Sequence, residues 1–214
     1  MKFAMSYSFG KDSSLSLWRM LSEGHEPVCL IVTINQEAER SWSHGVDLQL
    51  MDEVSRCLSI PLIKCFCTGE NYGHEFEKSL AGAKNQGAQA CVFGDIDIVE
   101  HLTWNQERCN AADLDCIVPL WKADRQAVVR EVVDEGFRAI IKCVDSRCLD
   151  DSFLGLTIDH DVLARLEEAG VDVCGENGEY HTFVNDGPIF KTPVAVSFGK
   201  IIDFGTHSAL DIVL

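Results

Sequence analysis

The stretch Ser6-Tyr7-Ser8-Phe9-Gly10-Lys11-Asp12-Ser13-Ser14 lies near the N-terminus, between two segments with different hydrophobic patterns. An apolar run at residues 3–5 precedes it, and apolar side chains recur at roughly helical spacing from Leu15 to Leu21. The order is therefore a strand, a Ser/Gly-rich turn and a helix. Such a turn presents unpaired backbone N–H groups at a helix N-terminus, where the helix dipole favours an anion.

The residue types in this turn suit a phosphate group and its metal ion. Gly10 lets the backbone approach a phosphate closely, the serine hydroxyls can donate hydrogen bonds, and Lys11 adds a positive charge. Asp12 does not suit a phosphate, but its carboxylate suits Mg²⁺. The turn is not a Walker A loop, because that pattern needs a second glycine before the lysine. The alternative without a function is a polar turn whose serine caps the helix.

The turn resembles the PP-loop, S-G-G-K-D-S, of the adenine nucleotide α-hydrolase-like ATP pyrophosphatases, which cleave ATP between the α and β phosphates. Phe9 departs from this pattern, because the family usually has its first glycine there. The resemblance implies ATP and Mg²⁺ as cofactors, with Asp12 as a metal ligand. The ATP-binding residues that it implies are Ser8, Phe9, Gly10, Lys11, Asp12, Ser13, Ser14, Ile34, His44, Gly94 and Asp95.

A second polar stretch, Gly175-Glu176-Asn177-Gly178-Glu179-Tyr180-His181-Thr182, follows a helix that we expect to end at Gly170. Loops that carry several ionisable groups are frequent functional sites, although a turn before a surface strand is the simpler alternative. Acidic neighbours favour the charged form of His181. With Cys174 before it and Asp186-Gly187-Pro188 after it, the stretch resembles the C-G-E-x-G-E-Y-H-T…D-G-P signature of the diphthine–ammonia ligase (DUF71) family, which is a PP-loop family.

This second resemblance implies further site residues. The catalytic residues that it implies are Lys11, Asp12, Glu176, Glu179 and His181. The substrate-binding residues that it implies are Glu176, Asn177, Gly178, Glu179, Tyr180, His181 and Thr182. We expect the side chains of Glu176, Glu179 and His181 to face the PP-loop across a cleft. One middle segment, residues 100–108, departs from the family's Ser-x-Tyr-Gln-x-x-Arg pattern, with Gln106 and Arg108 as candidate remnants.

The resemblance implies an ATP-dependent ligase that adenylates a substrate carboxylate, releases AMP and pyrophosphate, and transfers the acyl group to ammonia. The expected partners are ATP, ammonia and a carboxylate substrate, which is either a small molecule or a modified elongation factor. One alternative is a bacterial family member that acts on another carboxylate or amide, for example in corrinoid salvage. Others are a tRNA-modifying or sulfonucleotide PP-loop enzyme and a non-enzymatic nucleotide sensor.

Composition narrows the class of protein. The 214 residues include 34 acidic and 18 basic side chains, a net charge of −16, which argues against a nucleic-acid partner. No apolar run is long enough to span a bilayer and the N-terminus lacks a signal-peptide pattern, so we expect a cytoplasmic protein without a membrane partner. The ten cysteines contain no C-x₂-C pair and are expected to be reduced, mostly buried side chains. The sequence is compatible with a homodimer.

Apolar strands alternate with amphipathic helices along most of the chain. This pattern predicts an α/β fold with a parallel sheet covered by helices on both faces, HUP-like by resemblance. Ligands bind at the carboxyl ends of such strands, so the PP-loop and the Gly94-Asp95 loop are expected to share one cleft. We expect a PP-loop ATP-binding domain at 1–150 and a smaller α+β substrate-side lobe at 151–214. Its last strands are predicted at 194–198, 200–204 and 210–214, with turns at Gly199 and Gly205.

Overall fold

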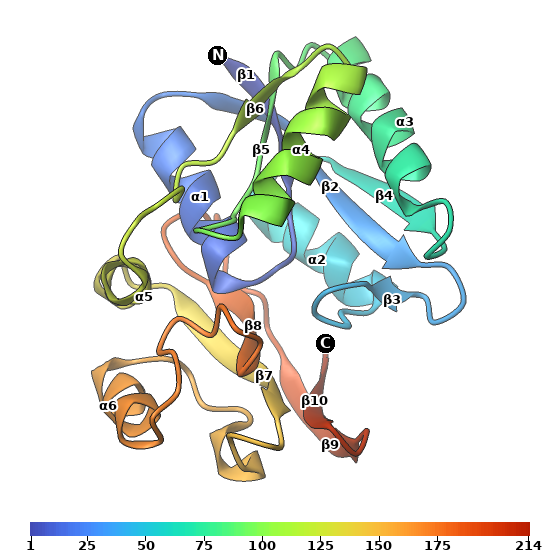
Figure 1. Ribbon diagram of the computed structural model, residues 1–214. Helices are drawn as coiled ribbons and strands as arrows, with labels where there is room; N and C mark the ends of the chain where they lie inside the picture. The colour runs from blue at the N-terminus through green and yellow to red at the C-terminus, as the bar shows by residue number, and fades with distance from the viewer.

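A mostly parallel sheet forms the first lobe of the computed structural model, which describes residues 1–214 (Figure 1). Its strands are β1 (Lys2–Ser6), β2 (Glu26–Asn35), β3 (Arg40–Ser41), β4 (Leu62–Cys67), β5 (Ala90–Val92) and β6 (Asp115–Ile117). β2, β1, β5 and β6 lie side by side in that order, and β4 also pairs with β2. All of these pairs are parallel, and only the short β3 pairs antiparallel, with the end of β2. The carboxyl ends of the parallel strands therefore lie at one edge.

Helices cover both faces of this sheet. They are α1 (Lys11–Ser22), α2 (Leu48–Leu58), α3 (Tyr72–Asn85) and α4 (Val99–Ala111). Phe3 and Met5 of β1 pack in one hydrophobic cluster with side chains of α1 and α2, whereas Ala4 packs in a second cluster with side chains of α3 and α4. This alternation along one strand places the two helix pairs on opposite faces. The predicted α/β architecture is confirmed.

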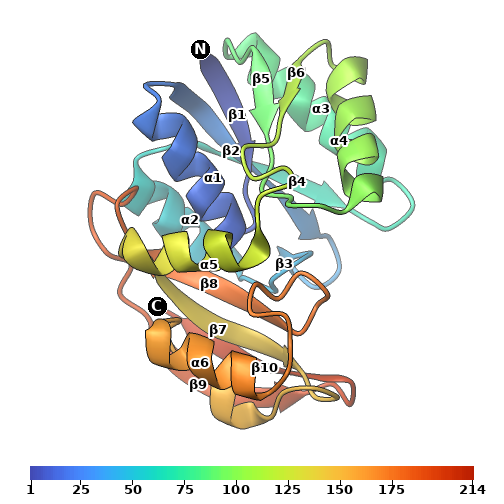
Figure 2. The same cartoon turned by 60° about the vertical axis from the view of Figure 1, so that its left-hand side comes forward.

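A smaller antiparallel sheet forms the second lobe (Figure 2). Its strands are β7 (Arg138–Asp145), β8 (Tyr180–Asp186), β9 (Ser197–Asp203) and β10 (His207–Val213), in the order β8-β7-β10-β9. The remaining elements are α5 (Arg125–Asp134), the 3₁₀ turn η1 (Asp151–Phe153) and α6 (His160–Glu168). Figure 2 shows α5 between the lobes and α6 on the second sheet. This lobe confirms the expected small α+β addition.

Two details of the second lobe differ from the sequence expectation. β7 pairs with β8 and β10, so the two sheets divide before Arg138 and not at residue 150. Because β7 is central in its sheet and mostly buried, its sequence is apolar like those of the parallel strands, and we included it in the domain at 1–150. β9 continues through Gly199 without a turn, and residues 194–196 lie outside any strand.

The lobes are joined by a shared core and by direct hydrogen bonds. One cluster of 44 buried residues includes side chains of both lobes. The backbone N–H of Lys11 donates to Thr182 Oγ1 at 3.0 Å, and the N–H of Val184 donates to the carbonyl of Phe9 at 2.8 Å. The start of β8 is thereby fixed against the PP-loop.

Two expectations from composition bear on the whole chain. None of the helices combines the length and the apolar character needed to cross a bilayer. All ten cysteines are free thiols, and most of them are buried, as expected.

Candidate functional site

The PP-loop leaves two helix N-terminal amides without a protein acceptor. Gly10 is the N-cap residue of α1, its backbone is extended, and no side chain caps the helix. Ser13 Oγ donates to the Gly10 carbonyl at 3.1 Å and lies 3.1 Å from Ser8 Oγ, which fixes the shape of the loop. The N–H of Lys11 is bound to Thr182, whereas those of Asp12 and Ser13 have no acceptor. These amides and the positive end of the helix dipole suit an anion.

Phe9 occupies the glycine position of the family pattern with an unusual backbone conformation. Its φ is 69°, in the left-handed region that disfavours residues with a Cβ. Its side chain is fully buried, with the ring centroid 6.4 Å from that of Phe183 and 5.2 Å from that of Tyr7. Phe9 can therefore contribute to the loop only through its backbone, and its side chain belongs to the core.

A cavity of about 210 Å³ lies where the PP-loop, the loop after β5 and the loop before β8 meet. Its lining residues are Lys11, Asp12, His44, Gly94, Asp95, Ile98, His101, Gly175, Glu176, Gly178, Tyr180, His181 and Thr182. The expectation that the PP-loop and the Gly94-Asp95 loop share one cleft is therefore confirmed. A smaller cavity, of about 70 Å³, lies beside Ser8, Thr33 and Tyr72.

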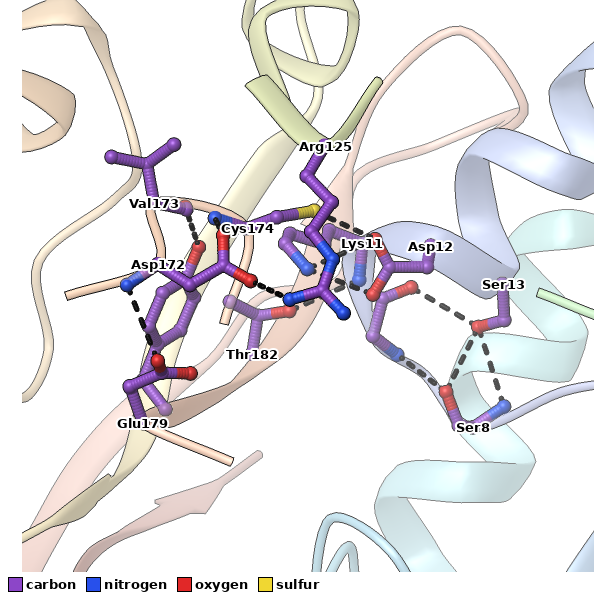
Figure 3. Close-up of polar contacts among 12 residues, drawn as sticks. Ser8, Lys11, Asp12, Ser13, Arg125, Asp172, Val173, Cys174, Glu179 and Thr182 are labelled. Carbon is purple, nitrogen blue, oxygen red and sulfur yellow. Dashed lines mark hydrogen bonds and ion pairs between the residues drawn. The ribbon is translucent and has the colours of Figure 1, made fainter. Parts of the chain in front are cut away.

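Charged groups of both signs meet at the centre of the larger cavity. Lys11 Nζ lies 2.8 and 2.9 Å from the two carboxylate oxygens of Asp12 (Figure 3). Glu176 has no hydrogen-bond partner, and burial together with the negative charge of Asp12 raises its pKa to about 7. The candidate ligand atoms of Asp12, Cys174 and Glu176 lie within 4.8 Å of one another.

This donor set suits a hard divalent cation held by carboxylates. A cation near Asp12 and Glu176 would offset the repulsion that raises the pKa of Glu176, and Mg²⁺ prefers such oxygen ligands. Burial raises the pKa of the Cys174 thiol to about 12, so its sulfur stays protonated and is a poor ligand for Mg²⁺. Asp12, which the sequence resemblance implied as a metal ligand, and Glu176 are thus the candidate metal ligands.

Two histidine rings face each other at one side of the cavity. His44 Nδ1–H donates to the Thr182 carbonyl at 2.6 Å, and its ring centroid lies 5.0 Å from that of His181. Burial lowers the pKa of His44 to about 3, and burial followed by the charge of Lys11 lowers the pKa of His181. The expectation that acidic neighbours favour a charged His181 is wrong, because desolvation is the larger effect. Both rings are neutral near pH 7.

Glu179 does not face the PP-loop, contrary to the sequence expectation. Its carboxylate accepts hydrogen bonds from the backbone N–H of Asp172 at 3.2 Å and from the backbone N–H and side-chain amide of Asn177, both at 3.0 Å. Figure 3 shows Glu179 on the far side of this loop from Lys11 and Asp12. Glu179 and Asn177 line a separate surface depression. They hold the loop in shape instead of lining the cavity.

Two further residues of the expected ATP-binding set lie away from both cavities. The side chain of Ile34 is fully buried in the hydrophobic core, because alternation along β2 turns Thr33, and not Ile34, toward the smaller cavity. Ser14 is also fully buried, and its Oγ lies 2.9 Å from the hydroxyl oxygen of Tyr7. Ser14 therefore anchors the loop to the core.

Arg125 is a positioning residue that the sequence analysis missed. Its guanidinium donates two hydrogen bonds of 2.7 Å to Asp97, which follows the Gly94-Asp95 loop. The same group donates to Asp172 in the loop before β8 (Figure 3). It also donates to Asn177 in that loop. Arg125 thus joins the two loops that form opposite sides of the cavity. No motif identified it, because its partners are distant in sequence.

The divergent segment at residues 100–108 reaches the site through different residues from those expected. It forms most of α4, where His101 Nδ1 lies 3.0 Å from one carboxylate oxygen of Asp95 and the Asn105 amide donates to the other at 2.7 Å. Gln106 is exposed, and Arg108 instead forms an ion pair with Glu77 of α3. The His101 and Asn105 side chains, one helical turn apart, therefore orient Asp95.

Comparisons with known proteins agree with the two sequence resemblances. Residues 1–132 match the family model "Diphthamide synthase N-terminal domain", and residues 124–213 match "Diphthamide synthase C-terminal domain". The rat (Rattus norvegicus) protein named diphthine–ammonia ligase is 26% identical over 98% of this chain and 86% of its own length. The human protein of the same name is 24% identical over the same shares.

A solved structure shows a weaker similarity. It is described as the crystal structure of a predicted subunit of tRNA methyltransferase from Methanocaldococcus jannaschii DSM. It is 17% identical in sequence, with a TM-score of 0.48 over 91% of this chain and all of that one. At this level of similarity, nothing about the function of the present chain follows from it.

Proposed function

The chain belongs to the diphthamide synthase family, and from this premise we propose that it is an ATP-dependent ligase that converts a substrate carboxylate to an amide. In this proposal the carboxylate attacks the α-phosphorus of ATP, pyrophosphate leaves, and ammonia then displaces AMP from the acyl-adenylate. The names of the curated relatives make diphthine the first acceptor to test. The observation that carries the proposal is the meeting of the PP-loop with the Glu176–Thr182 loop in one cavity.

The nucleotide phosphates would lie at the N-terminus of α1. The free amides of Asp12 and Ser13 support this placement, as does the buried ammonium of Lys11. Negative charge builds up on the departing pyrophosphate, and fixed N–H dipoles and a lysine stabilise such charge without reorganising. The nucleoside would extend toward the smaller cavity beside Ser8 and Thr33.

The carboxylates of Asp12 and Glu176 would hold Mg²⁺ in this enzyme. When bound, the ion would neutralise phosphate charge and polarise the phosphorus that is attacked. The contact between the Lys11 ammonium and Asp12 would orient the ammonium before ATP arrives.

The acceptor would enter from the side of His181. This residue and Gly178 line both the central cavity and a neighbouring open cavity of about 300 Å³, which leads to the surface. A neutral His181 can accept a proton, as is needed when ammonia adds to an acyl-adenylate and the ammonium group so formed must lose a proton. We therefore propose His181 as the general base and the open cavity as the acceptor entrance.

Analysis of the nucleotide products tests this function. The protein is incubated with ATP, Mg²⁺, an ammonium salt and an elongation factor that carries diphthine, and the nucleotides are separated by chromatography. We expect AMP and pyrophosphate, together with the mass change of the acceptor that replaces a carboxyl OH by NH₂. ADP as the main product would contradict the adenylation mechanism. AMP formation with no change of this acceptor would retain the mechanism and reject diphthine as the substrate.

A matched pair of lysine variants connects the activity to the site. Lys11→Met removes the buried ammonium at the PP-loop and should abolish pyrophosphate release. Lys78→Met removes an exposed lysine that pairs with Glu75 on the surface of α3, and it should leave the rate unchanged. Equal rates for the two variants would place the reaction elsewhere.

A further inference from the structure

A further pocket, half open to solvent, lies between the β3 region and the β9–β10 hairpin, and we call it the Lys142 chamber. Its volume is about 220 Å³. Sites for drug-sized ligands usually measure roughly 300–1,000 Å³, so the chamber suits a smaller molecule. Trp42, Ile202, Phe204 and Leu210 give it apolar walls, and Lys142 supplies a cationic group. The proposed reaction assigns no role to this chamber.

Lys142 is a buried cation without a partner. Only 4% of its surface is exposed, yet its ammonium makes no hydrogen bond and no ion pair. Lys11, the other buried lysine, is paired with Asp12. Burial of an ammonium group costs free energy unless an opposite charge or hydrogen-bond acceptor offsets it. The Lys142 side chain lines the chamber, so an anion that enters the chamber could supply the missing partner.

A local irregularity of the sheet accompanies this side chain. Ile141 pairs with Thr182 and Cys143 pairs with His181, so Lys142 is the extra residue where the β7–β8 register shifts. Such bulges re-aim a side chain and are frequent beside functional sites. The fold thus interrupts a regular strand pair at the residue that reaches the chamber.

The acidic groups nearest to Lys142 are already occupied. Asp211 accepts a hydrogen bond from the Arg40 guanidinium at 3.2 Å, and Arg40 also donates to the Gly45 carbonyl at 3.0 Å. Asp47 accepts from the N–H of Leu50 as the N-cap of α2. Arg40 and Asp211, which both line the chamber, offset each other, and Asp47 does not line it, so Lys142 is the one charged group of the lining without an ion-pair partner.

We propose that the Lys142 chamber binds a small organic monocarboxylate with an apolar body, whose carboxylate pairs with the Lys142 ammonium. One unpaired ammonium in the lining matches one carboxylate, and the apolar walls match a hydrocarbon or aromatic group. An inorganic anion would use the cation but not the walls. The chamber shares His44 with the nucleotide cavity, so a ligand there would contact the ring that holds the Thr182 carbonyl. This inference does not depend on the proposed function.

Calorimetric titration of the whole protein without ATP or metal tests the proposal. The probes are phenylacetate and its neutral isostere phenylacetamide, which differ only in the group that would meet Lys142. We expect phenylacetate to bind at least about tenfold more tightly than the amide, the discrimination that a charge-assisted hydrogen bond of about 1.4 kcal/mol or more supplies. Equal affinities, or no binding of phenylacetate, would overturn the proposal. So would tighter binding of inorganic phosphate than of phenylacetate.

A pair of variants assigns the effect to Lys142. Lys142→Met preserves the length and apolar packing of the side chain, and it should abolish the preference for phenylacetate. Lys200→Met removes an exposed lysine of the neighbouring β9 that does not line the chamber, and it should retain the preference. Loss of the preference in both variants would point to the overall charge and overturn the assignment.

Chemical protection of the unmodified protein gives a readout that does not depend on the folding of a variant. Acetic anhydride acetylates the free amine of a lysine, and mass spectrometry of peptides locates each acetyl group. Phenylacetate should slow the acetylation of Lys142 without affecting Lys200, whereas phenylacetamide should protect neither. Acetylation of Lys142 at an unchanged rate in saturating phenylacetate would overturn the proposal.

Discussion

Phe9 combines a strained backbone with a buried aromatic side chain. A residue with a Cβ in the left-handed region costs about 1–2 kcal/mol relative to the right-handed region. Phe9 nevertheless adopts a φ of 69°, because the Tyr7 and Phe183 rings enclose its side chain and its carbonyl binds β8. The loop thus keeps the conformation for which the family pattern uses glycine.

We therefore expect the Phe9 side chain to stabilise the folded protein and its backbone conformation to destabilise it. Phe9→Ala should destabilise the protein by about 3–5 kcal/mol, since it empties a buried ring site. Phe9→Gly should be more stable than Phe9→Ala by about 1 kcal/mol, because glycine adopts a positive φ without strain. Urea denaturation measures both values. A glycine variant less stable than the alanine variant would show that the loop stores no such strain.

Glu179 is the residue whose interpretation the structure changes most. Since its carboxylate accepts three N–H groups, Glu179→Gln replaces one acceptor oxygen by an NH₂ group that faces donors. We expect a loss of about 1–3 kcal/mol of stability and lower turnover, with the pH profile of the reaction unchanged in shape. The pH profile is the decisive measurement. Loss of one limb of that profile would instead return Glu179 to an acid–base role.

The orientation of single side chains limits what the sequence can predict at this scale. The motifs identified Lys11, Asp12 and Glu176, which do meet in the cavity. The motifs did not predict that Tyr180 lines the cavity and Glu179 does not. Adjacent residues at the start of a strand point to opposite sides, so only one of the two can face the cavity. Arg125 was missed because its role depends on Asp97 and Asp172, which only the folded chain brings together.

At the scale of elements, the loop after β5 packs closely against the first turn of α1. A Cβ added to Gly94 would lie 2.8 Å from the backbone nitrogen of Ser13 and 2.9 Å from its Cα. Both contacts are with backbone atoms, so α1 or the loop must move. The close approach therefore fixes how the PP-loop amides lie relative to Asp95.

Gly94→Ala should displace the helix N-terminus from the nucleotide. We expect ATP affinity to fall at least about tenfold and stability to fall by about 1–3 kcal/mol, the usual cost of overpacking. Gly82→Ala is the control, because Gly82 lies within α3 with open space around it, and it should raise stability by up to about 1 kcal/mol. Calorimetric titration with ATP measures the affinity. Unchanged ATP affinity in Gly94→Ala would show that the contact between Gly94 and α1 does not influence nucleotide binding.

Hydrophobic periodicity was sufficient to predict most elements and the helix-covered parallel sheet. It was not sufficient for β7, because a strand buried on both faces has the same apolar pattern in either sheet. It also failed at Gly199, where a glycine that indicates a turn lies within β9. The pairing partners of a strand are set by tertiary contacts, which periodicity does not contain.

At the scale of the whole molecule, the two lobes are built as one folding unit. The 44-residue cluster extends through both, and β8 binds the PP-loop through Thr182 and Val184. Arg125 adds a link between the loops of the two lobes at the cavity. The site therefore exists only when both lobes are folded and docked.

Such a unit should unfold in a single transition, and two separate probes can test this. All four tryptophans, at positions 18, 42, 104 and 121, belong to the first lobe, and only Trp42 borders the second lobe, so their fluorescence reports mainly on the first lobe. Hydrogen exchange of β7 and β8 amides reports on the second lobe. We expect the same urea midpoint from both probes in the wild-type protein.

The variant Thr182→Val sharpens this test because it acts at the junction of the lobes. Valine keeps the shape of threonine but leaves the buried N–H of Lys11 without its acceptor, which costs about 1–3 kcal/mol. In a single cooperative unit, this loss lowers both midpoints by the same amount, although the substitution lies in β8. Gly170→Ala, in the exposed turn after α6, strains a backbone with a φ of 72° away from the junction and serves as a comparison within the second lobe. If Thr182→Val lowered the midpoint of the β7 and β8 amides but left the tryptophan transition unchanged, the lobes would be independent and the cavity between them would open without global unfolding.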